Sequence, residues 1–192
     1  LDAGAPYAVL NPGSNEPGRR WPLSGYVAVA KRLLDRGYRV VFVGRPGERG
    51  DNHAIDEIAS EEGVIDLTGR TDLAQLLDLM NHAALVLSND SGPAHLSIAL
   101  ASPTVVIVGG GHFGSFVPYP GKIAPKNARF VYQKMECYHC FWRCHKRQTK
   151  FQLFPCIGAI GEDRVWSECE ALLGETPAGR PAGDEATPAV DR

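Results

Sequence analysis

The stretch Ser88-Asn89-Asp90-Ser91-Gly92-Pro93-Ala94-His95-Leu96 joins an apolar run that predicts a strand to an apolar run that predicts a helix. Pro93 fits a first helical position, because the N–H that it lacks would have no partner there. The first turn of such a helix offers unpaired N–H groups and the positive end of the helix dipole, which together attract phosphate. The stretch therefore predicts either an anion-binding turn or an ordinary capped turn, in which Asp90 or Ser91 only satisfies backbone donors.

Outward from this turn, strand and helix patterns alternate along the chain. Predicted strands span 7–10, 39–43, 64–67, 83–87 and 104–108, and predicted helices span 24–36, 52–61, 72–81, the segment after Pro93 and 163–173. Strands of continuous apolar character, separated by helices, indicate a parallel sheet covered on both faces. We expect an α/β, Rossmann-like domain over residues 1–173, followed by a disordered tail at 174–192, which is rich in Pro, Gly, Ala and acidic residues.

The loops at the carboxyl ends of these strands are where an open α/β sheet binds its ligand. They are rich in Gly, Ser, Thr and Asn, which lets the backbone approach a ligand and form anion-binding concavities. The chain has neither a Gly-x-Gly-x-x-Gly fingerprint after the first strand nor a Walker loop, so the predicted ligand is another phosphate-bearing molecule. Arg19 and Arg20 supply guanidinium groups that suit a diphosphate, unless both are merely solvated at the surface.

Composition narrows the classes of function. The chain has 192 residues and a net charge of −2 with mixed signs, so no basic surface argues for nucleic acid. It has no apolar run near the ~18–20 residues that span a bilayer and no signal-peptide pattern. It begins at Leu1 without an initiator Met, and we expect a processed chain or a piece of a longer one. Five cysteines are too few for a disulfide scaffold and indicate a reducing, cytoplasmic location.

With its loops in view, the chain resembles glycosyltransferase family 9, the heptosyltransferases that build the inner core of lipopolysaccharide. The motifs that match, in the family's order and spacing, are Asn11-Pro12-Gly13-Ser14, Gly18-Arg19-Arg20-Trp21-Pro22, Asp66-Leu67-Thr68-Gly69-Arg70-Thr71-Asp72-Leu73, Ser88 to His95, and Ser102-Pro103-Thr104-Val105. The resemblance implies a GT-B architecture, of which this chain matches the C-terminal, donor-binding half. Family members bind ADP-L-glycero-β-D-manno-heptose and transfer the sugar with inversion, without a catalytic metal or other cofactor.

The resemblance also assigns donor-binding residues. Ser14 and Arg19 would contact the diphosphate, although many relatives have Lys at the second position. The turn Asp90-Ser91-Gly92, together with His95, would contact the diphosphate and the sugar. Glu48 would bind the ribose hydroxyls, and residues 68–73 would line the adenine, largely through their backbone.

The segment after the last predicted strand departs from the family pattern. Many members have an aromatic residue followed by Gly-Pro-Thr there, whereas this chain has Val108-Gly109-Gly110-Gly111-His112-Phe113-Gly114. Gly110 is expected to bring backbone close to a phosphate or to the sugar, and His112 to donate to either.

Catalysis needs a general base as well as a donor site. The family places that base, an Asp, in its N-terminal half, so the catalytic residue is expected outside this chain. The isolated chain should then bind donor without turnover. The implied acceptor is a lipid A-core molecule reached through the N-terminal half, with peripheral association at the inner face of the bacterial inner membrane and no nucleic-acid partner.

A cysteine-rich insert at 136–156 is the second feature that needs an explanation. Cys137, Cys140, Cys144 and Cys156 have the number and rough spacing of a structural zinc site, with His139 and His145 as substitute ligands. The spacing does not match ferredoxin runs, which disfavours an iron–sulfur cluster. The alternative is that the thiols pack as small apolar groups in an irregular loop, as expected for Cys169 on the last helix.

Two rival functions remain at this point. One is a non-catalytic nucleotide- or metal-binding module on the same fold, because a fold alone does not fix a function. The other is an epimerase of nucleotide sugars, which is disfavoured by the lack of Gly-x-Gly-x-x-Gly after the first predicted strand and of a Tyr-x-x-x-Lys pair.

Overall fold

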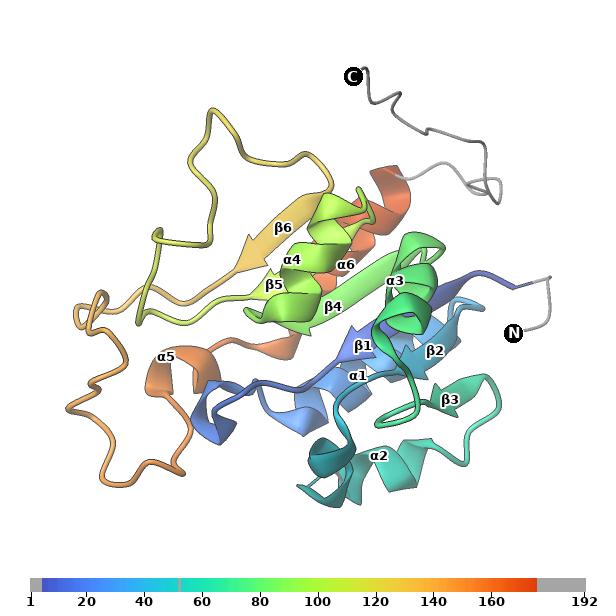
Figure 1. Ribbon diagram of the computed structural model, residues 1–192, viewed down its shortest axis with the longest axis horizontal. Coiled ribbons are helices and arrows are strands. Elements are labelled where there is room, and N and C mark those ends of the chain that lie inside the picture. The colour runs from blue at the N-terminus through green and yellow to red at the C-terminus, as the bar shows by residue number, and fades with distance from the viewer. Residues whose placement is uncertain (1–4, 52, 176–192) are drawn as a thin grey trace, which may run out of the picture.

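A six-stranded sheet forms the centre of the protein (Figure 1). The computed structural model describes residues 5–51 and 53–175. Its strands are all parallel, in the order β3-β2-β1-β4-β5-β6. Their bounds are β1 Tyr7–Asn11, β2 Arg39–Phe42, β3 Val64–Asp66, β4 Leu85–Asn89, β5 Thr104–Ile107 and β6 Ala128–Val131.

Helices cover both faces of this sheet (Figure 1). They are α1 Leu23–Leu34, α2 His53–Ile58, α3 Leu73–Asn81, α4 Gly92–Ala99, α5 Pro155–Gly158 and α6 Glu162–Glu175, with short 3-10 turns η1 Pro17–Arg19 and η2 Pro46–Asp51. Ala8 and Leu10 of β1 point into a core shared with α1, α2 and α6, whereas Val9 between them points into a core shared with α3. The predicted parallel α/β sheet with two covered faces is thereby confirmed.

Several local features agree with the sequence pattern. Asp72 caps α3 in a reciprocal capping box with Gln75, and Gly37 follows α1 with a φ of 80°. Cys169 is fully buried on α6. That helix extends through Glu175 and so includes the first two residues of the predicted tail, whose remainder, 176–192, lies outside the described residues.

The sequence did not predict β6 or α5. Residues 128–131 read Ala-Arg-Phe-Val, a run that is short and interrupted by a charge, and the strand pairs only with β5 at the edge of the sheet. Its formation depends on that pairing rather than on local pattern. The two long connections around it, 108–127 and 132–154, extend beyond the carboxyl ends of the strands (Figure 1). None of the described helices is long and apolar enough to cross a bilayer.

Candidate functional site

The strand order reverses direction between β1 and β4, so their carboxyl ends border the crevice where doubly wound sheets bind ligands. Asn11 ends β1, and its side-chain amide donates to Ser88 Oγ at 3.0 Å and to Ser91 Oγ at 3.4 Å. Asn11 and Ser88 are buried at the ends of otherwise apolar strands, and Ser91 is half-buried. We call Asn11, residues 88–91 and the first turn of α4 the switch-point site.

Asn89 ties this site to the loop after β1. Its side chain, in a residue that is 1% exposed, accepts a hydrogen bond from the Trp21 N–H at 3.0 Å. Its amide donates to the carbonyl oxygens of Pro12 at 2.8 Å and Gly13 at 3.3 Å. Sequence reasoning did not single out Asn89, although a polar residue at the end of an apolar strand was the signal that could have found it.

The start of α4 differs from an ordinary capped turn. Ser91 occupies the N-cap position, but its side chain makes no hydrogen bond to the first helical turn. Its hydroxyl donates instead to the Asn89 carbonyl oxygen at 3.1 Å. The first turn of α4 therefore meets the crevice without a side-chain cap from Ser91, which is the arrangement expected of an anion-binding helix terminus.

Asp90 does not cap this helix either, and its Oδ1 lies 3.6 Å from His95 Nε2 on the next turn. Burial raises the pKa of Asp90, while the nearby positive charge of His95, Arg19 and His112 acts to lower it. Two cationic groups from other segments thus act on the same carboxyl. The structure brings Asp90, Ser91, Gly92, His95 and Arg19 to one end of the sheet, as predicted from their motifs.

The two neighbouring arginines have different surroundings. Arg20 donates from Nε and Nη2 to the Ser14 carbonyl oxygen, at 3.2 and 3.1 Å, and so shapes the loop that holds Ser14. Arg19 lies 3.1 Å from Glu16, and its guanidinium stacks 4.0 Å above the Trp142 ring. The insert therefore presents Arg19 to the site, a contact that no motif could have indicated.

Glu48 joins the site from the β2 side. The residue is 6% exposed and accepts a hydrogen bond from the Arg45 N–H at 2.9 Å. Its carboxylate lies so close to Gly13 that a Cβ there would overlap it, which explains why the first loop needs glycine at this position. Beside it, the Thr68 hydroxyl is buried and has no hydrogen-bond partner among the described residues.

Gly110 is engaged by the insert rather than left open. Its N–H points at Cys156 Sγ, 3.4 Å away, and its carbonyl oxygen accepts from the His139 N–H at 2.8 Å. A Cβ on Gly110 would overlap the Tyr138 ring, and one on Gly111 would overlap Trp142. The triple glycine is thus explained by aromatic packing, and the expected contact of Gly110 with a donor remains a prediction that this backbone arrangement does not favour.

The four insert cysteines are free thiols, three of them half-buried and Cys156 buried on α5. Burial raises the pKa of Cys156, and the charges of Cys137, Cys140 and Cys144 raise it further. Four thiolate-forming groups suit a soft metal ion. Over residues 5–51 and 53–175, however, no three His, Cys, Asp or Glu side chains converge as ligands of one ion.

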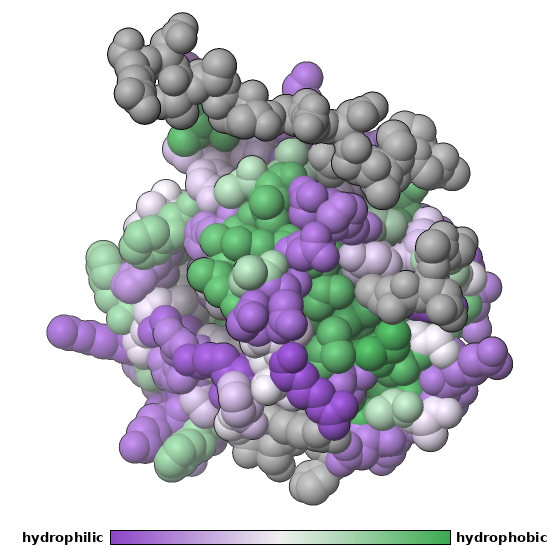
Figure 2. Space-filling model, turned by 45° about the vertical axis from the view of Figure 1, so that its right-hand side comes forward, coloured by the Kyte–Doolittle hydropathy of each residue, from purple (hydrophilic) through white to green (hydrophobic). Residues whose placement is uncertain are grey.

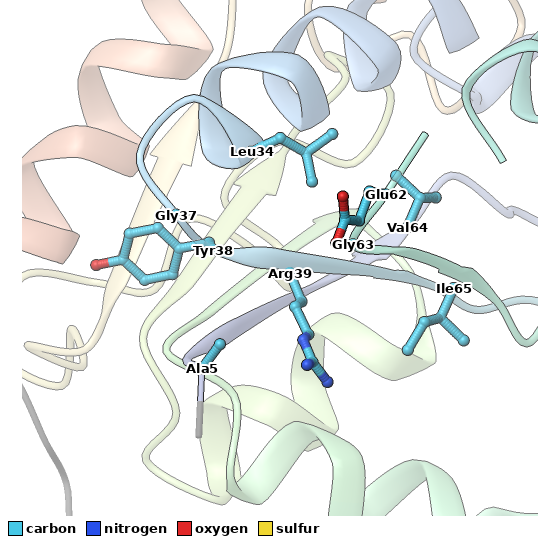
Figure 3. A pocket seen from close by; sticks show the side chains of 9 residues that line it. All are labelled: Ala5, Leu34, Gly37, Tyr38, Arg39, Glu62, Gly63, Val64 and Ile65. Carbon is cyan, nitrogen blue, oxygen red and sulfur yellow. The ribbon is translucent and has the colours of Figure 1, made fainter. Parts of the chain in front are cut away.

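A separate hollow of about 490 Å³ lies at the opposite, amino end of the strands (Figure 3). Figure 3 shows Tyr38 and Arg39 at the start of β2 and Val64 and Ile65 on β3 around it. Leu34 closes it from α1. None of the residues that were predicted to bind a ligand lines this hollow.

Comparison with known proteins gives the family context. The profile described as "Glycosyltransferase family 9 (heptosyltransferase)" matches residues 1–150. Lipopolysaccharide heptosyltransferase 2 of Escherichia coli K12 is 33% identical over 96 residues, which are 48% of this chain and 28% of that protein.

Solved structures agree. The structure of E. coli ADP-heptose lipopolysaccharide heptosyltransferase II superposes with a TM-score of 0.74 and 26% identity, covering 91% of this chain and 48% of that one. TibC, a dodecameric iron-containing heptosyltransferase solved in complex with ADP-D-beta-D-heptose, gives a TM-score of 0.65 over 91% of this chain and 48% of its own. Its 22% identity supports the fold alone. The chain spans less than half the length of the relatives it matches.

Proposed function

Because the chain belongs to glycosyltransferase family 9, we propose that it is the donor-binding half of a GT-B glycosyltransferase and that its donor is ADP-heptose or a related nucleotide sugar. The transfer would proceed with inversion onto a lipopolysaccharide core acceptor. We place this activity in the cytoplasm, with peripheral association at the inner membrane, and assign the acceptor and the general base to the part of the relatives that this chain does not match.

One observation carries the proposal. The α4 terminus opens at the reversal of the sheet without a side-chain cap from Ser91. Backbone N–H groups and the positive helix dipole there suit a diphosphate, and Arg19 adds a charged donor on the same side. In this arrangement Ser14, Arg19, Ser91 and Gly92 hold the diphosphate.

We assign the remaining contacts as the family motifs imply. In this assignment Asp90 and His95 meet the sugar side of the diphosphate, and the buried Glu48 binds the ribose hydroxyls. Thr68 and the residues after it line the adenine. Glycosidic cleavage leaves growing negative charge on the departing ADP, and the α4 terminus with Arg19 stabilises that charge where it develops. Without a base for the acceptor hydroxyl, the 192-residue chain binds donor but does not sustain transfer.

Calorimetric titration of the chain with ADP, UDP and GDP tests the proposal. Binding of ADP in clear preference to the other two supports it. If none of the three binds, the chain is better described as a non-catalytic module on the same fold, and the donor site is wrongly assigned. Steady heptose transfer by the chain alone would contradict the placement of the base outside it.

We also propose that the insert cysteines hold a structural metal ion, with zinc as the expected ion. The donor chemistry of four free thiols, Cys137, Cys140, Cys144 and Cys156, supports this. The described side chains would have to move together to become ligands of one ion. Thiolate ligands also bind iron, so iron is the competing ion. A bound metal ion would cross-link the loop and would take no part in the reaction.

Elemental analysis of protein prepared without chelator should find about one zinc or iron per chain. The variant Cys140→Ser should lose it, whereas Cys169→Ser, in the buried core of α6, serves as the control and should keep it. Metal-free protein with an intact insert would contradict the proposal and favour the thiols as packing groups.

A further inference from the structure

Tyr119 is placed against the switch-point site by the long connection between β5 and β6. Its ring packs on an apolar cluster built from α4, β5 and β6, with Phe130 edge-on at 5.9 Å between ring centroids. Its hydroxyl lies 2.9 Å from Nδ1 of His95, and the two rings meet edge-on. Tyr119 is thus half-buried and held by its ring, and within the described part of the chain its hydroxyl is hydrogen-bonded to His95.

The other nitrogen of the same imidazole faces Asp90. His95 Nε2 lies 3.6 Å from Asp90 Oδ1. An ionised carboxylate only accepts hydrogen bonds, so it favours the imidazole form that carries its proton on Nε2. In neutral His95 this leaves a lone pair on Nδ1, and the Tyr119 hydroxyl can donate to it. The contacts at the two nitrogens therefore favour the same tautomer.

We propose that Tyr119 is a positioning residue for donor binding, which acts by holding His95 with its Nε2–H directed to the Asp90 side of the site. The inference rests on the proposed function, because it is the donor diphosphate or sugar that would receive this N–H. With the opposite tautomer, the Nε2 lone pair would face an acidic side chain and an anionic ligand, and binding would weaken.

Arg19 and His112 are ionisable groups that act together with His95 on the Asp90 carboxyl. Among the described residues, the hydrogen-bond partner of His95 Nδ1 is the Tyr119 hydroxyl. The tautomer is therefore expected to depend on Tyr119 itself.

The nitrogen-15 chemical shifts of the His95 ring in the ligand-free 192-residue chain test this directly. We expect a protonated Nε2 and an unprotonated Nδ1 in the wild type at a pH where His95 is neutral. Tyr119→Phe should shift both signals toward a mixture of tautomers while keeping the ring and its packing. Tyr7→Phe is the matched control, because it also deletes one hydrogen bond, from the Tyr7 hydroxyl to the Leu79 carbonyl oxygen, at the far end of the sheet.

Calorimetry with ADP gives the second readout. Tyr119→Phe should weaken ADP binding by about threefold to tenfold, the effect of one lost positioning hydrogen bond, and Tyr7→Phe should leave it unchanged. Unchanged ring shifts in Tyr119→Phe, or a wild-type proton on Nδ1, would overturn the inference even if ADP binds. A wild-type chain that binds no ADP would overturn the proposed function, while the ring shifts would still decide whether Tyr119 sets the tautomer.

Discussion

The carboxyl end of the sheet holds the candidate site, whereas the amino end holds a hollow that none of the predicted ligand-binding residues lines. The amino end has an open hollow of about 490 Å³, lined by Leu34, Tyr38, Val64 and their neighbours. Figure 2 brings that side of the molecule forward and shows apolar patches interrupted by hydrophilic residues. The carboxyl end instead gathers buried Asn and Ser side chains, a helix terminus that Ser91 leaves uncapped, and Arg19.

The volume of a hollow therefore does not by itself locate the functional site in this fold. Burying polar side chains costs free energy unless they are hydrogen-bonded, so a buried network such as Asn11, Ser88 and Asn89 indicates a position where geometry is being fixed. The hollow at the amino end has no comparable network among the residues that line it.

The largest expected effect is on stability, from Asn89→Ala. This change leaves the Trp21 N–H and the Pro12 carbonyl without their partners in a buried position. We expect the free energy of unfolding to fall by about 3 kcal/mol, measured by urea denaturation. Asn81→Ala, at the exposed end of α3, should change it by less than about 0.5 kcal/mol. Equal effects of the two changes would refute a fixed network at the switch point.

The next effect is on ligand affinity. Arg19→Ala should weaken ADP binding by about 1–3 kcal/mol, because a charged hydrogen-bond donor to the diphosphate is lost. Arg39→Ala removes the same charge at the amino-end hollow and should leave the affinity as it was. Calorimetric titration of both variants checks this. An unchanged ADP affinity in Arg19→Ala, or a weaker one in Arg39→Ala, would show that the phosphates do not bind at the carboxyl end of the sheet.

The third effect is again on stability, is smaller than that of Asn89→Ala, and is expected where the insert packs on Gly110. Gly110→Ala places a Cβ in the Tyr138 ring and should destabilise the fold by about 1–2 kcal/mol through overpacking. Gly121→Ala, with open space around its Cβ position, is the control and should be close to neutral. Thermal unfolding of both variants separates the outcomes, and a neutral Gly110→Ala would mean that the insert does not pack on the triple glycine.

The smallest effect concerns pH. Burial raises the pKa of Asp90 above its ordinary value of 3.8, so between these two pKa values the folded state binds more protons than the unfolded state. The free energy of unfolding contributed by Asp90 therefore falls as pH rises through that range. Asp90→Asn should remove this slope and slightly stabilise the ligand-free chain at neutral pH. Urea denaturation from acid to neutral pH measures it, with Asp35→Asn on the surface as the control, and a slope that persists in Asp90→Asn would contradict the assignment.

Much of this architecture could be predicted from the sequence. The five strands with continuous apolar runs, the Asp72 cap and the buried Cys169 follow from local pattern, and strand-end loops in a parallel sheet meet by topology. The sequence therefore predicts that Asp90, Ser91 and His95 lie together at the carboxyl end of the sheet.

What the sequence could not give depends on contacts between distant segments. The edge strand β6 forms on β5, and Trp142 reaches Arg19 from a segment more than a hundred residues away. Tyr138 filling the space over Gly110 has no local signature either. The same holds for Tyr119, whose hydroxyl finds His95 only through the packing of its ring.

The most direct test is an amide chemical-shift titration of the isotope-labelled chain with ADP. We expect shifts on binding in the backbone amides at the switch-point end, namely those of Ser14, Ser91, Gly92 and His95. The amides of Gly37 and Gly63 beside the amino-end hollow should stay unchanged. Shifts confined to the amino end, or no shifts at all at saturating ADP, would contradict the claim that the switch-point site holds the nucleotide.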